Sequence, residues 1–440
     1  MKGSDIMYHF IGIKGTGMSA LAVILKQLGY EVNGSDIAKH FFTESELIKN
    51  NITITTYDES NIKEGLIIIK GASITPDNVE LMAAKKLNLE IINYEEMVGR
   101  LTTQFKTICI SGCHGKTTTT AMTAHVLNQI TGINYLIGDG TGNATPDNEF
   151  LALESCEYRR HFLEYTPYYA VILNIDLDHV DYFKDIDDVF LAYQQLADKA
   201  THMVIACGDD ELAKKITSKK KIAFFGTNDD NDIKAMNIDY KASGTSFDVY
   251  ALGELYGHFD LPIYAKHQLL DALAVITICY YEKIDALLVN KCFQTFTGAK
   301  RRFHETKAGN SVIIDDYAHH PNEAKSTINA IKQKYPNKKI ISIFQPHTFT
   351  RTKEFALDLA NVLKETNEAY IMDIHPAREK QEDYPEVTKD IIISKLPNGH
   401  ALTIDDADIL NQYDDAVFIF MSPNDISKLE DDLIKLKSNN

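Results

Sequence analysis

The stretch from Thr107 to Thr120, which reads TICISGCHGKTTTT, constrains the fold more than any other part of the chain. It begins as an apolar, β-branched run, which predicts a buried strand. Gly112 and Gly115 then allow a tight turn, and a helix is expected to begin at Lys116. Successive backbone N–H groups in such a turn, beside the N-terminus of a helix, bind phosphate oxygens. The stretch therefore predicts a phosphate-binding loop at the end of a strand.

Two side chains in this loop point to a nucleoside triphosphate. The Lys116 ammonium can reach the outer phosphates, and the Thr117 hydroxyl can bind the accompanying Mg²⁺. The general form of the loop has its first glycine farther upstream, where this chain has Ile110 and Ser111. The loop here is the shorter Gly112-x-x-Gly115-Lys116-Thr117. The alternative is a glycine turn followed by an ordinary threonine-rich helix.

Length and composition limit the class of protein. A chain of 440 residues is too long for one ordinary core, so about two or three domains are expected. The net charge of -17 argues against nucleic-acid partners and against an anionic membrane surface. The longest apolar run is too short to insert into a bilayer. The six cysteines are scattered and lack metal-ligand spacing, which favours a reducing, cytoplasmic location and predicts no zinc site.

The first segment carries a second glycine loop. A strand is expected to lead into Gly12, and Gly15-x-Gly17-x-x-Ala20 has the spacing of a dinucleotide-binding turn. Asp36 follows about twenty residues later, where an acid reads a ribose hydroxyl. Ser73 follows a further predicted strand, 65–70, at the same edge of the sheet. The pattern predicts a site for a nucleotide diphosphate, and a tight turn that needs small residues is the alternative.

Acids, an amide and an imidazole follow two predicted strands of the second segment. The strand 150–153 leads to Glu154 and Glu157, and the strand 169–173 leads to Asn174 and His179. Oxygen ligands with one imidazole suit Mg²⁺ held between protein and ATP phosphates. Solvated loop charges are the alternative for any single acid. Shorter strands at 233–240, 245–250 and 258–263 predict a small antiparallel addition.

The third segment begins at a basic joint, Lys300-Arg301-Arg302, which is a candidate phosphate clamp in an acidic chain. A solvated basic hinge is the alternative. Predicted strands at 312–315, 340–344, 369–372 and 417–421 alternate with helical stretches. Tyr317 and His319 follow the first of these strands, and His347 and Arg351 follow the second. Side chains at the carboxyl ends of such strands predict a ligand site.

The whole chain is therefore predicted to be an α/β protein of three domains. Residues 1–103 are expected to form an N-terminal Rossmann-like domain. Residues 104–297 form a central α/β domain of the phosphate-loop ATPase type, with the small antiparallel addition. Residues 298–440 form a C-terminal Rossmann-like α/β domain.

These motifs, in this order, resemble the Mur ligase family over essentially the whole chain. The motifs that carry the resemblance are GIKGTGMS (12–19), GCHGKTT (112–118), NIDLDH (174–179), DYAHHP (316–321) and FQPHTFTR (344–351). The family itself has the short glycine loop. Two stretches depart from the family pattern. Residues 265–271 read AKHQLLD, which keeps His267 but lacks the usual asparagines, and residues 422–426 read SPNDI, which lacks the usual glycines.

The resemblance implies a Mg²⁺-dependent reaction with three substrates: UDP-N-acetylmuramate, ATP and L-alanine. The expected enzyme joins L-alanine to the muramyl carboxylate through an acyl phosphate, in peptidoglycan precursor synthesis. A related ligase that attaches a recycled tripeptide to the same UDP-sugar shares nearly all of these motifs and remains open. An NAD-dependent dehydrogenase and a non-enzymatic nucleotide-binding protein are further alternatives. A monomer or homodimer is expected, with one domain for each substrate.

The resemblance also implies roles for the residues that match the family motifs. Catalysis is expected to involve Lys116, Glu157, His179 and Arg302. ATP is expected to bind at Gly112, His114, Gly115, Lys116, Thr117, Thr118, Asn174, His267 and Asp316. The UDP-sugar is expected to bind at Gly12, Gly15, Thr16, Gly17, Met18, Ser19, Asp36 and Ser73. The metal ligands implied are Thr117, Glu157 and His179. The amino acid is expected to bind at Tyr317, His319, His347 and Arg351.

Overall fold

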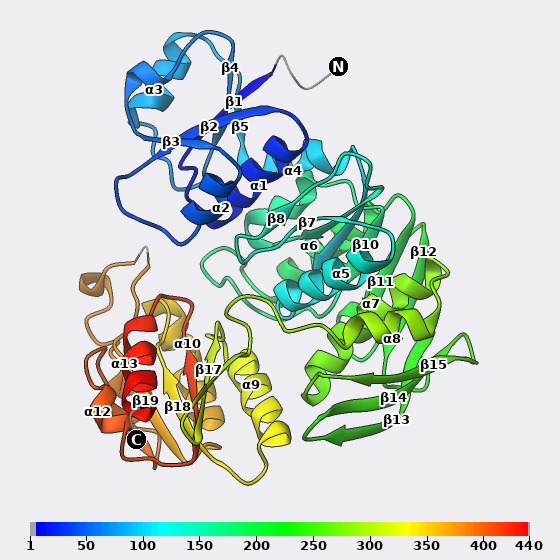
Figure 1. The fold of residues 1–440 in the computed structure, drawn as a ribbon, viewed down its shortest axis with the longest axis vertical. Helices are drawn as coiled ribbons and strands as arrows, with labels where there is room; N and C mark the ends of the chain where they lie inside the picture. The colour runs from blue at the N-terminus through cyan, green and yellow to red at the C-terminus, as the bar shows by residue number, and fades with distance from the viewer. Residues whose placement is uncertain (1–5, 378, 439–440) are drawn as a thin grey trace. The chain divides into compact units, whose positions relative to one another are not determined.

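The computed structural model describes residues 6–377 and 379–438, which contain three β-sheets, each covered by helices (Figure 1). The ends of the first and third predicted domains, residues 1–5 and 439–440, lie outside the described residues. Two compact units are present. Among the described residues, the first comprises those up to 236, together with 249–257 and 270–296, and the second comprises 237–248, 258–269 and those from 297 onward. The prediction of an α/β fold is confirmed.

The N-terminal sheet is a five-stranded, doubly wound sheet in which all the pairings are parallel. Its strands, in the order β3-β2-β1-β4-β5, are β1 Met7–Ile11, β2 Glu31–Asp36, β3 Thr53–Thr56, β4 Leu66–Lys70 and β5 Ile91–Asn93. Its helices are α1 Thr16–Gln27, α2 Glu44–Lys49, α3 Val79–Lys86 and α4 Tyr94–Thr102. The strand order reverses at β1, which pairs with β2 on one side and β4 on the other. This reversal opens the crevice in which such sheets bind ligands, and the first glycine loop lies at it.

One glycine of this sheet is required by close packing. A Cβ atom at Gly34 of β2 would lie 2.6 Å from the Phe10 carbonyl oxygen and 2.7 Å from Ile13 Cδ1. We expect Gly34→Ala to lower the free energy of unfolding by about 1–3 kcal/mol, because the backbone of β1 would have to shift. The urea midpoint of the full chain measures this effect. Gly71→Ala is the control, since its Cβ would meet the Ile11 oxygen at an ordinary 3.5 Å; equal midpoints for the two variants would contradict the prediction.

The central sheet has ten strands in the order β15-β14-β13-β12-β11-β10-β6-β9-β7-β8. They are β6 Lys106–Ser111, β7 Asn134–Leu136, β8 Gly142–Asn143, β9 Phe150–Glu154, β10 Tyr169–Ile172, β11 Met203–Cys207, β12 Lys221–Gly226, β13 Ile233–Lys241, β14 Gly244–Ala251 and β15 Glu254–Leu261. The helices are α5 Lys116–Ile130, α6 Ile186–Asp198, α7 Ala265–Tyr281 and α8 Ala286–Phe293, with short 3-10 helices that include η3 Tyr158–Glu164. Strands β13 to β15 continue this sheet, because β13 pairs in parallel with β12.

The phosphate-loop strand β6 lies deep inside this sheet, between β9 and β10. Both neighbours run parallel to it, with Ile110 opposite Glu154 on one side and Val171 on the other. Parallel strands place their carboxyl ends at one edge of the sheet. The loops that follow β6, β9 and β10 therefore meet at that edge.

The C-terminal sheet has six strands in the order β16-β17-β21-β18-β19-β20. The strands are β16 His304–Ala308, β17 Ser311–Asp316, β18 Lys339–Phe344, β19 Glu368–Ile371, β20 Gly399–Ala401 and β21 Ala416–Met421. The helices are α9 Pro321–Lys334, α10 Phe349–Leu363, α11 Asp390–Ile393, α12 Ala407–Leu410 and α13 Ser427–Ser438. Only the β16–β17 pairing is antiparallel among the described strands of this sheet. Each face has its own core: Ile314 packs with residues of α9 and α10, and the adjacent Ile313 with residues of α12 and α13.

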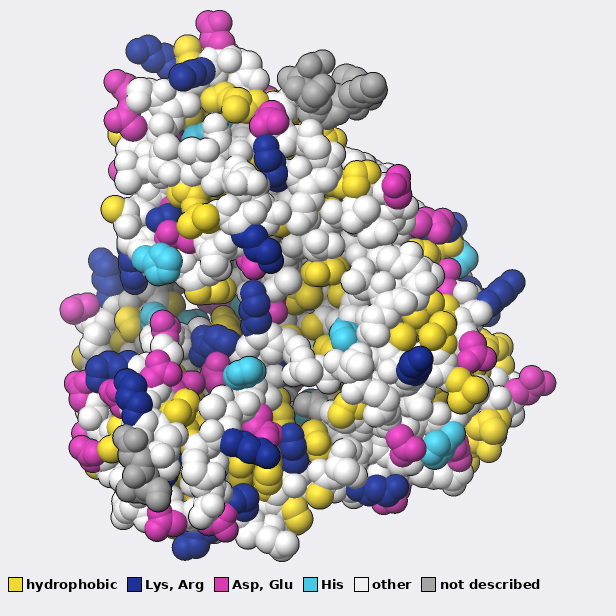
Figure 2. Space-filling model, viewed as in Figure 1, with side chains coloured by type: hydrophobic (Ala, Val, Ile, Leu, Met, Phe, Trp, Pro, Cys, Tyr) yellow, Lys and Arg dark blue, Asp and Glu magenta, His cyan; other side chains and the backbone are white. Residues whose placement is uncertain are grey.

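The surface carries charges of both signs. On the face shown in Figure 2, Lys and Arg side chains are interspersed with Asp and Glu side chains. The chain has 62 acidic and 45 Lys and Arg residues. None of the helices in the described part of the chain has the length and apolar content needed to cross a bilayer.

Candidate active site

The phosphate loop connects β6 to α5 through two glycines with positive φ. Gly112 has a φ of 148° and Gly115 a φ of 83°. A Cβ atom at Gly115 would lie 2.4 Å from Asp271 Oδ1, so both the backbone conformation and the space favour glycine. Gly115 is the N-cap of α5 and has no side chain to cap it. The N–H groups of the first turn of α5 are therefore suited to bind an anion, and the loop fits a phosphate group.

Lys116 forms a buried ion pair with Glu157. Its Nζ lies 3.0 Å from Glu157 Oε2 and 3.3 Å from Oε1, and it also donates to the carbonyl oxygen of Gly112 at 2.5 Å. The Lys116 side chain is 13% exposed and that of Glu157 is 1% exposed. Burial opposes the charge on Lys116, but the attraction of Glu157 outweighs it and raises the pKa of Lys116. The ammonium is therefore held in its charged form at the phosphate loop.

Thr117 contacts the other acid of the β9 strand end. Its hydroxyl donates to Glu154 Oε1 at 3.0 Å, and Glu154 Oε2 accepts from the Gly138 N–H at 2.7 Å. Glu154 thus connects the first turn of α5 to the loop before β8. Thr118, the next expected ligand residue, is half-buried on α5.

Asn174 holds the loop from the β10 side. Its Oδ1 accepts from the His114 N–H at 2.8 Å, and its Nδ2 donates to the His114 carbonyl oxygen at 2.9 Å. The oxygen and the nitrogen of the Asn174 amide therefore both hydrogen-bond to the backbone of His114. The structure brings together the two expected ATP residues, and it gives Asn174 the geometry of a residue that positions the loop.

His179 lies beside the same buried carboxylate as Lys116. Its Nε2 is 3.6 Å from Glu157 Oε1, and its ring lies against the Tyr158 ring with centroids 4.6 Å apart. A carboxylate with an imidazole is a donor set that fits Mg²⁺ between protein and phosphates. The third expected ligand, Thr117, is turned to Glu154. Cys156, which was not predicted from the sequence, joins this cluster, since its thiol lies within 4.8 Å of the other ligand atoms. Burial raises the pKa of the Cys156 thiol to about 12.

The N-terminal glycine loop has its own acid. The two Asp36 oxygens accept from the Lys14 and Ile37 N–H groups at 2.8 Å each, so the expected ribose-binding acid also fixes the loop backbone. The Lys14 ammonium pairs with Glu44 at 2.9 Å. The other residues expected to bind the sugar nucleotide differ in how exposed they are to solvent. Those that reach the surface at least in part are Gly15, Thr16, Gly17 and Ser73, and those that are buried are Gly12, Met18 and Ser19.

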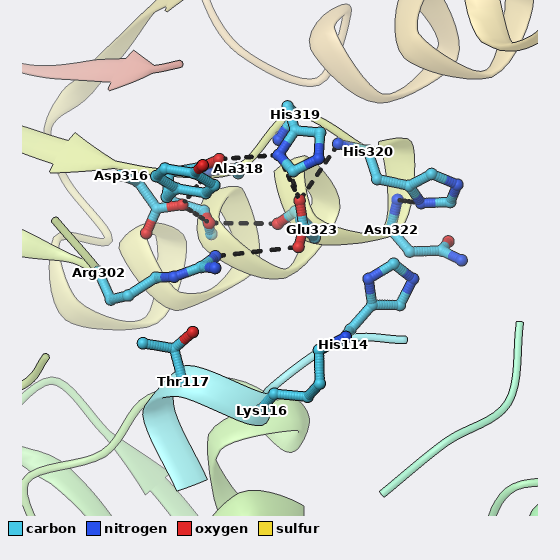
Figure 3. A network of polar contacts seen from close by, with 12 residues as sticks. His114, Lys116, Thr117, Arg302, Asp316, Ala318, His319, His320, Asn322 and Glu323 are labelled. Carbon is cyan, nitrogen blue, oxygen red and sulfur yellow. Dashed lines mark hydrogen bonds and ion pairs between the residues drawn. The ribbon is translucent and has the colours of Figure 1, made fainter. Parts of the chain in front are cut away.

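In the C-terminal domain, Asp316 and Glu323 organise the polar residues that follow β17 (Figure 3). Asp316 accepts from the Phe303 and Ala318 N–H groups at 2.9 Å each and from the Thr327 hydroxyl at 3.2 Å. Burial raises the pKa of the Asp316 carboxyl, and the nearby Arg302 guanidinium lowers it less. The carboxylate is thus committed to holding the turn that carries Tyr317 and His319.

Arg302 and His319 meet at Glu323 in the first turn of α9. Arg302 Nη1 lies 3.8 Å from Glu323 Oε1, and its guanidinium carbon is 4.8 Å from the centroid of the Tyr317 ring. Glu323 Oε2 accepts from the His319 N–H at 3.0 Å and lies 3.3 Å from His319 Nδ1. These contacts group the basic joint with the residues of the β17 strand end.

The β18 strand end contributes His347 and Arg351. Arg351 Nη1 lies 3.2 Å from His347 Nδ1, and the His347 ring lies 5.7 Å from that of His319. His375, which the sequence analysis missed, follows β19 and pairs with His347 in an isolated parallel bridge, with ring centroids 5.6 Å apart. Burial lowers the pKa of His375. The position of His375, shortly after the predicted strand 369–372, is the sequence feature from which this residue could have been predicted. The four residues expected to hold the amino acid follow β17 and β18, the two strands that flank β21 in this sheet. His267, an expected ATP-binding residue, lies in the first turn of α7.

Three models of one family match the chain in succession. The Mur ligase family, catalytic domain, matches residues 7–106; the Mur ligase middle domain matches 110–279; and the Mur ligase, glutamate ligase domain, matches 301–419. Together they cover most of the chain, in the order expected for the family.

Solved structures share the fold over the whole chain. UDP-N-acetylmuramate-alanine ligase MurC from Thermotoga maritima superposes with a TM-score of 0.82 and 24% identity, covering 99% of this chain and 100% of that one. A murein peptide ligase from Psychrobacter arcticus gives 0.71 and 19%, with 99% of each chain covered. The MurF ligase from Thermotoga maritima in complex with ADP gives 0.64 and 17%, covering 93% and 96%. The chain belongs to the Mur ligase family of ATP-dependent ligases, which form carbon–nitrogen bonds in peptidoglycan precursors.

Proposed function

We propose that the protein joins L-alanine to the carboxylate of UDP-N-acetylmuramate at the expense of ATP, releasing ADP and phosphate. The observation that carries the proposal is the phosphate loop with Lys116 paired to a buried Glu157, beside His179. The family supports a ligase, and the likeness to the alanine ligase extends over the whole chain. An NAD-dependent dehydrogenase would leave this triad without a role.

The reaction requires an activated acyl group, because the oxygen of a carboxylate is a poor leaving group. A carboxylate oxygen attacks the γ-phosphorus, and the bond to ADP breaks. The amine of L-alanine then attacks the acyl carbon, and phosphate leaves as the nitrogen loses a proton. In such transfers the protein chiefly aligns the reactants and stabilises charge. Lys116 would hold the outer phosphates, Arg302 would stabilise the transferred phosphoryl group, and Asp316 would bind the ATP ribose.

Mg²⁺ would be held by Thr117, Glu157 and His179, and it would neutralise charge on the phosphates and the carboxylate. The Thr117 hydroxyl donates its proton to Glu154, which leaves the lone pairs of its oxygen available to the metal. Asn174 would keep the loop backbone in place through its two contacts with His114. The first glycine loop, with Asp36 and Ser73, would bind the UDP portion of the other substrate.

The experiment that tests the proposal is a ligation assay over a set of acceptors. The purified chain is incubated with UDP-N-acetylmuramate, ATP, Mg²⁺ and either L-alanine or a murein tripeptide, and both phosphate release and the mass of the product are followed. We expect acceptor-dependent product with L-alanine. Product with the tripeptide alone would replace the proposal by the second candidate, which the likeness to a murein peptide ligase favours. Absence of product with both would remove the ligase proposal.

Arg351 would grip the carboxylate of the incoming amino acid. A planar guanidinium makes a two-point contact with a carboxylate that an ammonium cannot reproduce. We expect Arg351→Lys to raise the KM for L-alanine by roughly ten- to a hundredfold, which corresponds to about 1.5–3 kcal/mol for a lost charge-assisted hydrogen bond, and to change the KM for ATP little. Steady-state kinetics with each substrate varied in turn measures this.

The matched control for this variant is Arg100→Lys. Arg100 makes an exposed pair with Glu90 at 2.8 Å in the N-terminal domain, and its replacement should leave both KM values unchanged. If Arg351→Lys changes only the KM for ATP, Arg351 is not the carboxylate clamp and the amino acid binds elsewhere.

A further inference from the structure

We propose that a cavity in the N-terminal domain binds a small oxyanion, a carboxylate or a phosphate, at a site separate from the first glycine loop. The cavity has a volume of about 200 Å³, and its lining includes His9, Asn33, Thr53, Asn61 and Lys63. Liquid water occupies about 30 Å³ per molecule, so the space equals about seven water molecules and admits an acid of about three or four carbons. The inference goes beyond the proposed ligation and does not depend on it.

The register of the N-terminal sheet gathers the lining side chains on one face. His9 of β1 pairs with Asn33 of β2, and Asn33 pairs in turn with Thr53 of β3. Register partners in neighbouring strands direct their side chains to the same face of a sheet. Met7 and Leu66, the first residues of β1 and β4, also line the cavity. The cavity therefore reaches the amino ends of these strands, whereas the first glycine loop follows the carboxyl end of β1.

A buried hydrogen-bond network fixes the wall formed by His9. The residue is 1% exposed, with Nδ1 2.7 Å from Asn33 Oδ1 and Nε2 3.4 Å from Glu80 Oε2. Glu80 of α3 is fully buried, and its Oε1 accepts from Asn61 Nδ2 at 2.6 Å and from the Asp58 N–H at 3.1 Å. Its carboxylate is thus occupied by protein donors and does not line the cavity. The network holds two lining amides in place, as in a preformed ligand site.

The lining offers hydrogen-bond donors and a cation. The chain has 62 acidic residues against 45 Lys and Arg, yet none of the acidic side chains in the described part of the chain lines this cavity. The Asn33 oxygen faces His9, and its Nδ2 group has no hydrogen-bond partner among the described residues. Lys63 is exposed, and within the same residues its ammonium makes no ion pair. An amide N–H₂ group and an ammonium suit carboxylate or phosphate oxygens.

Calorimetry on the full chain tests the site with two probes, malonate and inorganic phosphate. We expect at least one probe to bind, and the tighter of the two shows whether the site prefers a carboxylate or a phosphate. Binding should persist in the presence of saturating UDP and of saturating ATP. Displacement by either nucleotide would place the probe at a glycine loop and overturn the proposal, as would the absence of binding by both probes.

Asn33→Asp is the variant that removes the site. It keeps an oxygen for His9 but replaces the amide donor by a negative charge, so the Kd of the probe should rise by roughly ten- to a hundredfold, the factor for one charge-assisted hydrogen bond. Lys63→Met should raise the Kd by about two- to fivefold, because an exposed cation contributes less. Lys85→Met, which changes an exposed lysine of α3 outside the lining, is the control. An unchanged Kd in Asn33→Asp, or equal effects of the two lysine variants, overturns the proposal.

Histidine NMR of the full chain locates the bound probe. His9 is one of 15 histidines, and its imidazole signal is the one that is lost in His9→Gln. We expect the probe to shift this signal in the wild-type chain over the concentration range in which calorimetry detects binding. Binding heat without a shift of the His9 signal would place the probe elsewhere and overturn the proposal. This measurement decides the matter on the wild-type chain even if thermal unfolding shows that Asn33→Asp does not fold.

Discussion

Lys116→Ala is expected to reduce ATP-dependent ligation by about 10²–10³-fold, the usual effect of removing a preorganised group that stabilises transition-state charge. Lys116 begins α5 at the phosphate loop, and its ammonium is kept charged by Glu157. The UDP-sugar loop, Gly12 to Gly17, belongs to a different sheet from the loop Gly112 to Gly115. We therefore expect the affinity for UDP-N-acetylmuramate to stay near the wild-type value.

Calorimetry with UDP-N-acetylmuramate and the ligation rate, measured on the same preparation, check this prediction. The variant leaves Glu157 buried without its cation, which can cost about 3–5 kcal/mol of stability, so the thermal unfolding curve must be recorded with it. Lys116→Met together with Glu157→Gln removes the uncompensated charge and should recover stability without recovering ligation. Lys214→Ala, which removes an exposed ion pair with Asp230, is the control for both the single and the double variant. Retained ligation with lost sugar-nucleotide affinity would contradict the assignment of the two loops.

Glu157→Gln is expected to raise the Mg²⁺ concentration for half-maximal rate by about a hundredfold, since even indirect metal partners contribute about 10–100-fold. The amide keeps the shape of the side chain but removes the charge that attracts the cation. Glu154→Gln is expected to have a much smaller effect. The Glu154 carboxylate accepts hydrogen bonds from the Thr117 hydroxyl and the Gly138 N–H, and an amide oxygen still accepts one of them.

To compare the variants, the ligation rate of each is measured as a function of Mg²⁺ concentration. All substrates are kept at saturating concentrations, and saturation is verified for each variant. The two acids lie only three residues apart, so each variant serves as the other's matched control. If the Glu157→Gln curve is unchanged, Glu157 is not a metal ligand. A larger shift for Glu154→Gln would instead move the metal to the acid that contacts Thr117.

Strand and helix positions near the loops could be predicted because local chemistry decides them. The apolar run before Gly112 had to be a buried strand, and the structure has β6 at Lys106–Ser111 and α5 beginning at Lys116. The positive φ at Gly112 and Gly115 follows from the same turn. Short or polar strands have a less distinct hydrophobic pattern, so they are harder to predict from the sequence. The edge strands β16 and β20 were not predicted, because a strand of few buried residues has no clear periodicity.

The residue pattern was enough to predict the α/β class, the two glycine loops and the sheet edge at which the polar residues gather. The partner of each polar side chain, in contrast, depends on how the strands are arranged in the folded chain. Glu154 and Glu157 follow the same predicted strand, but the register that places Ile110 opposite Glu154 brings Glu154 to Thr117 and leaves Glu157 for Lys116 and His179. The same register brings Cys156 within reach of His179, and the pairing of β18 with β19 brings His375 to His347. Local sequence cannot specify such pairs, because strand order and register bring together residues that are far apart in the chain.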